Sequence, residues 1–301
     1  MGTALPKIRE KRCKTALSKS ALSYDYTVNP YTGCLHGCVY CYANFMRRFT
    51  GHLQDAWGSF VDVKVNLLDV LAKELPKRVG GSVWLSSVCD PYQSVEAKYK
   101  LTRGAVELIS EYSEFSISIL TKNALVLRDV DLLTRIRDRV DVGFTITTFN
   151  DQAQQIFEPC SSPVKDRIEA VRQLNQAGFE TWVFIAPMLP YVTESDLEKG
   201  LHQLEEAGVK KLMTDRYNAR GLIINQTLRA YESWSSAHGA EHIRQLLLEG
   251  GKYYRVLDEK ILSLWRKIPN ASYERDLDWF HRRISKRSVM RSHVRSGETI
   301  S

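Results

Sequence analysis

The most informative stretch of the sequence is GCLHGCVYCYA, which covers residues 33–43. It places Cys34, Cys38 and Cys41 on one short segment in a C-x3-C-x2-C pattern, with a glycine directly before each of the first two cysteines. Glycine lets the backbone turn tightly around the sulfur atoms. Three thiolates at this spacing can wrap one compact metal group, and they suit a cubane iron–sulfur cluster whose fourth iron is open to an outside ligand.

A mononuclear zinc site is the alternative interpretation of the same cysteines. Structural zinc takes four ligands, and His36, Cys89 or Cys160 could supply the fourth. The loop follows the first β-prone segment, residues 24–28, and α/β folds carry their chemistry at the carboxyl ends of their strands. This position favours the cluster over zinc.

The chain beyond the loop alternates between β-prone and amphipathic helical segments. With residues 24–28 as the first strand, we expect further strands at residues 83–88, 116–121, 142–147, 181–186 and 211–214. The helices between them are predicted at residues 67–75, 101–112, 126–137, 163–177 and 194–207. Such alternation indicates parallel strands with right-handed crossovers, in a doubly wound sheet or an open or closed barrel. After residue 221 the pattern predicts helices at 243–248, 257–267 and 277–284.

Composition excludes several classes of protein. The chain has 301 residues, of which 44% are hydrophobic and 26% charged, as in globular proteins. No apolar run approaches the ~18 residues that a membrane helix needs, and the first residues contain no apolar signal-peptide core. We therefore expect a cytoplasmic protein with no membrane partner. Three of its six cysteines lie within eight residues, which indicates a metal site rather than disulfides, while Cys13 and Cys160 are expected to be incidental free cysteines.

The positive charge is concentrated at the two ends of the chain. Residues 1–20 hold six Lys and Arg side chains against one acid, Glu10, and residues 281–296 hold six against none. We expect a basic N-terminal arm (1–20), a core domain (21–220), a helical extension (221–280) and a disordered basic tail (281–301). Basic arms suit a polyanion such as nucleic acid, although solvated tails that only aid solubility would look the same.

With these motifs the chain resembles the radical S-adenosylmethionine (SAM) enzymes, and within them the spore photoproduct lyase-like branch. The superfamily pattern is the cysteine triplet with an aromatic residue before its last member. The sequence motifs typical of the branch are DY (25–26), NPYTGCLHGCVYCYA (29–43), SVCDPYQSVE (87–96), LTKN (120–123), SP (162–163) and RIEAV (167–171). The resemblance spans roughly residues 18–215.

This resemblance implies a partial parallel (β/α)6 barrel that holds a [4Fe-4S] cluster and SAM. Cys34, Cys38 and Cys41 would bind the cluster, and the open iron would chelate the SAM amine and carboxylate. One electron, delivered by a donor such as ferredoxin or flavodoxin, would cleave SAM to methionine and a 5′-deoxyadenosyl radical. The cofactors then carry the difficult chemistry while the barrel positions them.

The resemblance also implies which side chains bind SAM. In the superfamily the end of the second strand contacts the SAM amine, and the ends of the third and fourth strands face its ribose and carboxylate. The matching residues here are Ser86, Ser87, Asp90, Lys122, Thr145 and Thr147. Lys122 is the carboxylate partner by charge. As alternatives, Asp90 could simply cap an Asp-Pro turn and the threonines could reflect β-propensity.

Five further candidates come from the same family pattern. Arg167 would contact the SAM carboxylate or the substrate, or would lie on an exposed helix face, and Pro187 ends the strand that packs on adenine. Tyr40 and Tyr42 occupy the places of the tyrosines that flank the last cluster cysteine in spore photoproduct lyase. In that enzyme a cysteine near the end of strand two returns a hydrogen atom; the equivalent place here is Ser87, two residues before Cys89, which is a departure from the pattern.

The sequence therefore predicts a radical SAM enzyme that acts on an unknown substrate, with a DNA lesion as one candidate. A second hypothesis is a radical SAM enzyme that modifies a protein or a small molecule. A third is a nucleic-acid-binding module in which the cysteine triplet holds a structural metal.

Overall fold

The computed structural model describes residues 5–20, 22–219, 223–235, 237–269 and 271–275. Its main feature is an eight-stranded sheet with the order β11-β10-β9-β8-β7-β6-β3-β2. The central strands are parallel and follow one another in the chain: β3 (Tyr26–Val28), β6 (Gly81–Leu85), β7 (Phe115–Thr121), β8 (Val140–Thr145), β9 (Trp182–Met188) and β10 (Lys211–Arg216). This arrangement confirms the predicted α/β fold with a partial parallel (β/α)6 barrel.

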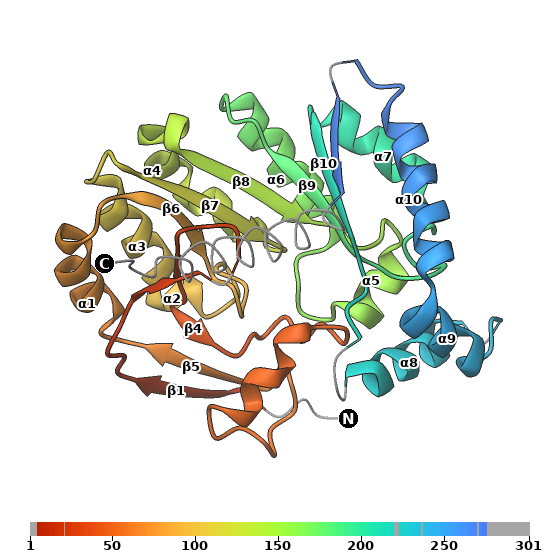
Figure 1. Cartoon of the computed structure of the whole chain (residues 1–301), viewed down its shortest axis with the longest axis horizontal. Helices are drawn as coiled ribbons and strands as arrows, with labels where there is room; N and C mark the ends of the chain where they lie inside the picture. The colour runs from red at the N-terminus through yellow and green to blue at the C-terminus, as the bar shows by residue number, and fades with distance from the viewer. Residues whose placement is uncertain (1–4, 21, 220–222, 236, 270, 276–301) are drawn as a thin grey trace, which may run out of the picture.

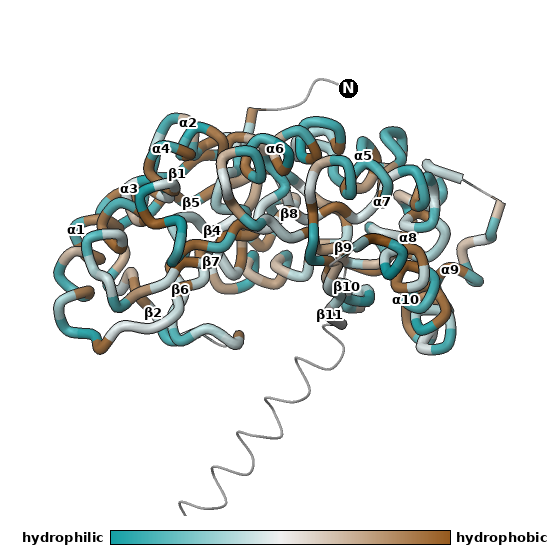
Figure 2. Tube along the Cα trace, turned by 90° about the horizontal axis from the view of Figure 1, so that it is seen from above, coloured by the Kyte–Doolittle hydropathy of each residue, from teal (hydrophilic) through white to brown (hydrophobic). Residues whose placement is uncertain are grey.

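Helices connect these strands and cover one face of the sheet (Figure 1). They are α1 (Leu67–Glu74), α2 (Glu96–Tyr99), α3 (Leu101–Ser110), α4 (Val130–Arg135), α5 (Asp151–Phe157), α6 (Val164–Gln176) and α7 (Leu197–Glu206). Alternate strand residues such as Leu85, Ile117 and Ile119 are fully buried in this core. In Figure 2 many of the outward turns of the helices are teal, the colour of hydrophilic residues.

Two helices end where the sequence predicted, whereas one predicted strand and one predicted helix have different bounds in the structure. Gly178 and Gly208 have φ values of 86° and 84° and end α6 and α7, as their positions predicted. The strand predicted at 83–88 stops at Leu85, because Ser86 adopts a left-handed φ of 69°. The helix predicted at 126–137 is split into the 3-10 helix η3 (Ala124–Asp129) and α4, where the buried Asp129 carboxylate binds Arg103 and Arg128.

The basic segment at the N-terminus is built into the fold. β1 (Lys7–Lys11) pairs in parallel with β5 (Phe60–Lys64), which pairs with β4 (Tyr31–Thr32) in a second, three-stranded sheet. β2 (Leu17–Lys19) pairs with β3 in the main sheet. Arg9 and Lys11 both bind the Asp62 carboxylate, at 3.0 and 2.6 Å. Residues 7–11 therefore form a strand rather than a free arm, and part of their charge is neutralised within the protein.

The C-terminal part of the described chain is helical, as predicted. It contains α8 (Ile223–Trp234), α9 (Ala240–Glu249) and α10 (Gly251–Trp265), and then β11 (Ser272–Arg275) pairs in parallel with β10. The sequence pattern predicted the positions of α9 and α10 but missed α8. The helix predicted at 277–284 and the basic tail lie outside the described residues. None of the described helices is both long and apolar enough to cross a membrane.

Replacement of Asp62 by asparagine tests how strongly the N-terminal strand is held. The Asp62 side chain is 4% exposed and also contacts His52 Nε2 at 3.0 Å, so the change leaves three donors without a carboxylate. We expect Asp62→Asn to lower the free energy of unfolding by about 1–3 kcal/mol, measured by chemical denaturation. The matched control is Asp131→Asn, because Asp131 pairs with Arg103 on the surface. Equal effects of the two changes would contradict the expectation.

Candidate active site at the cysteine loop

The cysteine loop runs from the end of β4 into the 3-10 helix η1 (Tyr42–Arg48). Its turns are closed by backbone hydrogen bonds from Gly37 N to Cys34 O and from Cys41 N to Cys38 O, at 3.3 and 3.1 Å. Gly33 has a φ of 89°, and a Cβ atom at this position would lie 2.5 Å from the Phe60 carbonyl oxygen. Only glycine fits there, so the loop enters its turn directly against β5.

All three cysteines of the loop are free thiols: Cys34 and Cys38 are buried and Cys41 is half-buried. Burial raises the pKa of the Cys38 thiol to about 12, and it also raises the pKa values of Cys34 and Cys41. Thiols in such surroundings become thiolates when a metal replaces the proton. The donor set therefore fits a thiolate-ligated group.

The arrangement of possible metal ligands is the next feature of the site. Within the part of the chain that the structure describes, no three His, Cys, Asp or Glu side chains are grouped so that they could hold one metal ion. A cubane cluster does not require its cysteine ligands to meet at one metal ion, because each of them binds a different iron atom. The three thiols are thus compatible with a [4Fe-4S] cluster.

Cys89 is the fourth cysteine at this end of the barrel. Its Sγ atom donates a hydrogen bond to the Tyr31 carbonyl oxygen at 3.4 Å, and its side chain packs with that of Cys41 against the apolar cluster of Cys34, Ala43, Trp57 and Phe60. Burial raises the pKa of Cys89 to about 12. Of the other two residues considered as a fourth zinc ligand, Cys160 is exposed and His36 is buried against Asp90 and Asn123.

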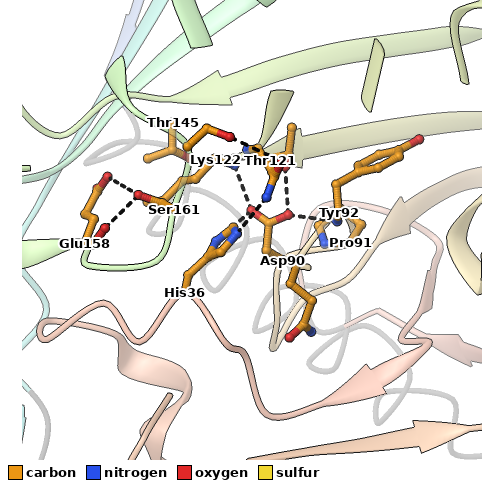
Figure 3. A network of polar contacts seen from close by, with 12 residues as sticks. His36, Asp90, Pro91, Tyr92, Thr121, Lys122, Thr145, Glu158 and Ser161 are labelled. Carbon is orange, nitrogen blue, oxygen red and sulfur yellow. Dashed lines mark hydrogen bonds and ion pairs between the residues drawn. The ribbon is translucent and has the colours of Figure 1, made fainter. Parts of the chain in front are cut away.

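The Asp90 carboxylate joins three segments around the loop (Figure 3). One oxygen accepts hydrogen bonds from Tyr92 N at 2.8 Å and from Thr121 Oγ1 at 2.7 Å, and the other accepts from Lys122 N at 2.7 Å. His36 Nδ1 lies 3.5 Å from the second oxygen. Asp90 therefore caps its Asp-Pro turn, as the simpler interpretation held, and at the same time ties the turn after β6 to the end of β7.

A buried ion pair holds Tyr40 on the other side of the loop. Glu158 accepts hydrogen bonds from the Tyr40 hydroxyl and from Arg167 Nη2, and all three side chains are buried. Burial alone would raise the pKa of the Glu158 carboxyl, but Arg167 and Lys122 outweigh this effect and lower it to about 2. Glu158 thus stays ionised in the protein interior. Tyr40 also bonds Thr147 Oγ1 at 3.0 Å.

Arg167 has more hydrogen-bond partners within the protein than either interpretation predicted, a ligand contact or an exposed helix face. Besides Glu158, its guanidinium donates to Ser161 Oγ, to Ser162 O at 2.8 Å and to Thr145 O at 2.9 Å. Its side chain is fully buried, so the exposed helix face considered as an alternative is wrong. Glu158 was not predicted from the sequence. The available signal was the place of Arg167 on the apolar face of α6, where a buried cation requires an acid.

Lys122 presents a cation to the cysteine loop. Its Nζ atom lies 5.8 Å from the centroid of the Tyr40 ring, and within the described ranges it has no hydrogen bond or ion pair. Burial would lower the pKa of this ammonium, but Cys38 and Glu158 outweigh burial and raise it. A half-buried ammonium without a partner is suited to an anionic ligand.

The remaining predicted residues lie at the ends of neighbouring strands. The hydroxyl of Ser86 is buried and has no hydrogen-bond partner among the described residues. Ser87 N donates to Asn29 Oδ1 at 2.8 Å, and the Tyr42 hydroxyl donates to Ser87 O. Thr147 Oγ1 donates to the Ala186 carbonyl at 2.9 Å, directly before Pro187. The chain thus brings the predicted residues to one end of the parallel strands, around the cysteine loop.

Comparison with known proteins identifies the family of this domain. The family model described as the radical SAM superfamily matches residues 28–204, more than half of the chain. The chain belongs to the radical SAM superfamily. This radical SAM domain includes the cysteine loop and β6 to β9.

The chain is also similar to individual proteins. An uncharacterized protein of Methanocaldococcus jannaschii is 39% identical over 165 residues, which are 55% of this chain and 61% of the relative. Spore photoproduct lyase of Bacillus subtilis is 25% identical over 190 residues, 61% of this chain and 51% of the lyase. These matches span about half to three fifths of the relatives' own length.

A solved structure shows the same fold. Spore photoproduct lyase complexed with dinucleoside spore photoproduct has a TM-score of 0.63 and 17% identity, with 89% of this chain and 81% of that chain covered. This likeness covers a larger share of the chain than the family domain does and supports the partial barrel fold.

Replacement of Gly33 tests whether the loop depends on its close approach to β5. We expect Gly33→Ala to lower the free energy of unfolding by about 1–3 kcal/mol more than Gly51→Ala, measured by chemical denaturation. Gly51 is the matched control because it also has a positive φ, 74°, but has no atom within 4 Å of an added Cβ. If the two variants lose the same stability, backbone conformation alone explains the glycine.

Proposed function

We propose that this chain is a [4Fe-4S] enzyme that reductively cleaves SAM, with Cys34, Cys38 and Cys41 as the cluster ligands. The observation that carries the proposal is the set of three buried or half-buried free thiols on one loop of a radical SAM domain. Beside this loop lies the Lys122 ammonium, which has no hydrogen bond or ion pair with any described residue. When bound, the cluster supplies the electron that splits SAM into methionine and a 5′-deoxyadenosyl radical. A reductant such as ferredoxin or flavodoxin would deliver that electron.

We assign Lys122 to the SAM carboxylate. Its ammonium has no hydrogen bond or ion pair among the described residues, and it lies over the Tyr40 ring of the cysteine loop at 5.8 Å. Its charge is maintained because Cys38 and Glu158 raise its pKa against the effect of burial. Arg167 is occupied by Glu158 and three other acceptors, so we assign it to positioning Tyr40 rather than to direct contact with SAM.

The other strand ends provide the rest of the SAM site in this proposal. The Ser86 hydroxyl, which is buried without a hydrogen-bond partner among the described residues, is assigned to the SAM amine, with Ser87 next to it and Asp90 fixing the turn that follows. Thr145 and Thr147 line the fourth strand end, and the half-buried Pro187 offers an apolar surface for adenine.

Tyr42 and Cys89 are the residues that we assign to hydrogen-atom transfer with the substrate. Cys89 packs on the same apolar cluster as the loop, and Tyr42 directly follows the last cluster cysteine. A damaged nucleotide in DNA is the substrate class we favour, because spore photoproduct lyase is among the relatives. The offset of Cys89 from the family's donor position leaves a protein or small-molecule substrate as the second candidate.

Metal analysis separates the enzyme from a nucleic-acid-binding module with a structural metal. For anaerobically purified protein we expect about four irons per chain and an electron paramagnetic resonance (EPR) spectrum of the reduced state that shifts when SAM is added. Cys41→Ala should abolish formation of 5′-deoxyadenosine. Zinc in place of iron, with no response to SAM, would support the binding module instead.

Replacement of Lys122 tests its assignment to the SAM carboxylate. We expect Lys122→Met to retain its iron and to raise the dissociation constant for SAM by about 10- to 100-fold, since a hydrogen bond to a charged group contributes about 1.5–3 kcal/mol. SAM binding can be followed by the EPR shift. Lys165→Met is the matched control, because Lys165 is exposed on α6. Unchanged SAM affinity in Lys122→Met would refute the assignment.

A further inference from the structure

Trp57 has an unsatisfied donor beside the cysteine loop. Its side chain is 8% exposed, and the indole Nε1 atom is buried without a hydrogen-bond partner in the described part of the chain. A buried N–H without an acceptor costs about 1–3 kcal/mol, and native proteins seldom retain one without a reason. By contrast, the buried indole N–H of Trp265 donates to Ser272 O at 3.1 Å.

The surroundings of Trp57 show which acceptor is missing. The indole packs with Cys34, Ala43 and Phe60 in one apolar cluster, and Cys41 and Cys89 pack against the same cluster. Phe60 fixes the indole through an edge-on contact with a centroid distance of 5.9 Å. The unsatisfied indole N–H therefore lies in the cluster that also contains the Cys34 side chain, with Cys41 packed against it.

Trp57 reaches this place from outside the cysteine motif. It belongs to the segment between η1 and β5, and it also lines a cleft of about 370 Å³ whose other walls include Cys38 on the loop and Gln226 and Arg229 on α8. Trp57 and the loop residue Cys38 thus line the same cleft, and the indole packs beside the loop from outside the cysteine motif.

We propose that the Trp57 indole N–H donates a hydrogen bond to the cluster at the Cys41 thiolate and thereby raises the reduction potential of the cluster. This inference rests on the proposed function, because it requires the cluster at the loop. Hydrogen bonds to the sulfur atoms are among the factors that set iron–sulfur potentials. The reduced cluster carries one more negative charge, so a donor stabilises it more than the oxidised cluster. Trp57 is a tuning residue in this role.

The test is a redox titration of anaerobically purified protein, monitored by EPR, for the native chain and for Trp57→Phe. Phenylalanine keeps an aromatic ring in the apolar cluster and removes only the donor and part of the ring system. At a fixed applied potential we expect the ratio of reduced to oxidised cluster to fall about tenfold, which corresponds to 59 mV for a one-electron couple. Trp265→Phe removes a buried indole N–H on α10 and should leave the ratio unchanged.

Iron content separates failure of this inference from failure of the proposed function. If the native chain binds about four irons and Trp57→Phe titrates at the native potential, the inference is wrong and the enzyme assignment stands. If the native chain binds no iron, the proposed function itself fails. A shift of the same size in Trp265→Phe would mean that general loosening of the fold, rather than the lost donor, changes the potential.

A second measurement covers the case in which Trp57→Phe does not bind iron. In native protein labelled with 15N in the tryptophan indole rings, pulsed EPR of the reduced cluster should show coupling to one 15N nucleus. This coupling should persist when the same label is present in Trp265→Phe. Absence of any indole 15N coupling in the native protein would overturn the proposal without recourse to the variant.

Discussion

The buried ion pair between Glu158 and Arg167 is the interaction on which the geometry of the site depends. Two charges removed from water are tolerable only when each has the other and further hydrogen bonds. Here the guanidinium also holds the Thr145 carbonyl at the end of β8, and the carboxylate holds the Tyr40 hydroxyl in the cysteine loop. The pair therefore connects the barrel to the loop, and loss of either charge would leave the other buried and uncompensated.

Asp90 makes the corresponding connection on the other side of the loop. Its carboxylate binds the hydroxyl of Thr121 and the backbone N–H of Lys122, so the turn after β6 and the end of β7 share one anchor. Lys122 owes its position to this anchor, while its ammonium has no partner among the described residues. Structural contacts thus satisfy most polar groups around the loop, and the proposed ligand contacts rest on three groups without a partner in the described part of the chain, on Lys122, Ser86 and Trp57.

The sequence predicted the barrel because the spacing of apolar residues within each segment and the order of strands and helices can both be followed along the chain. The cysteine loop was likewise predictable from the spacing of three residues. Glu158 was not, because its contact with Tyr40 joins positions 118 residues apart. The α8 helix was missed because the apolar pattern of its buried face, which includes Ile223, Ile224 and Tyr231, is interrupted by Thr227 and Ala230. The β1 strand was missed because none of its side chains is buried, so no alternation of apolar and polar residues marks it.

The exposed, charged character of β1 has a consequence for the behaviour of the protein at high concentration. β1 forms the outer edge of the three-stranded sheet, beside the almost wholly buried β5, and four of its five residues are Lys7, Arg9, Glu10 and Lys11. An open edge on β5 would be a template for pairing with another chain and for aggregation. A strand of charged residues covers that edge and is itself a poor template. The charged strand β1 therefore protects the edge of β5 from pairing with another chain.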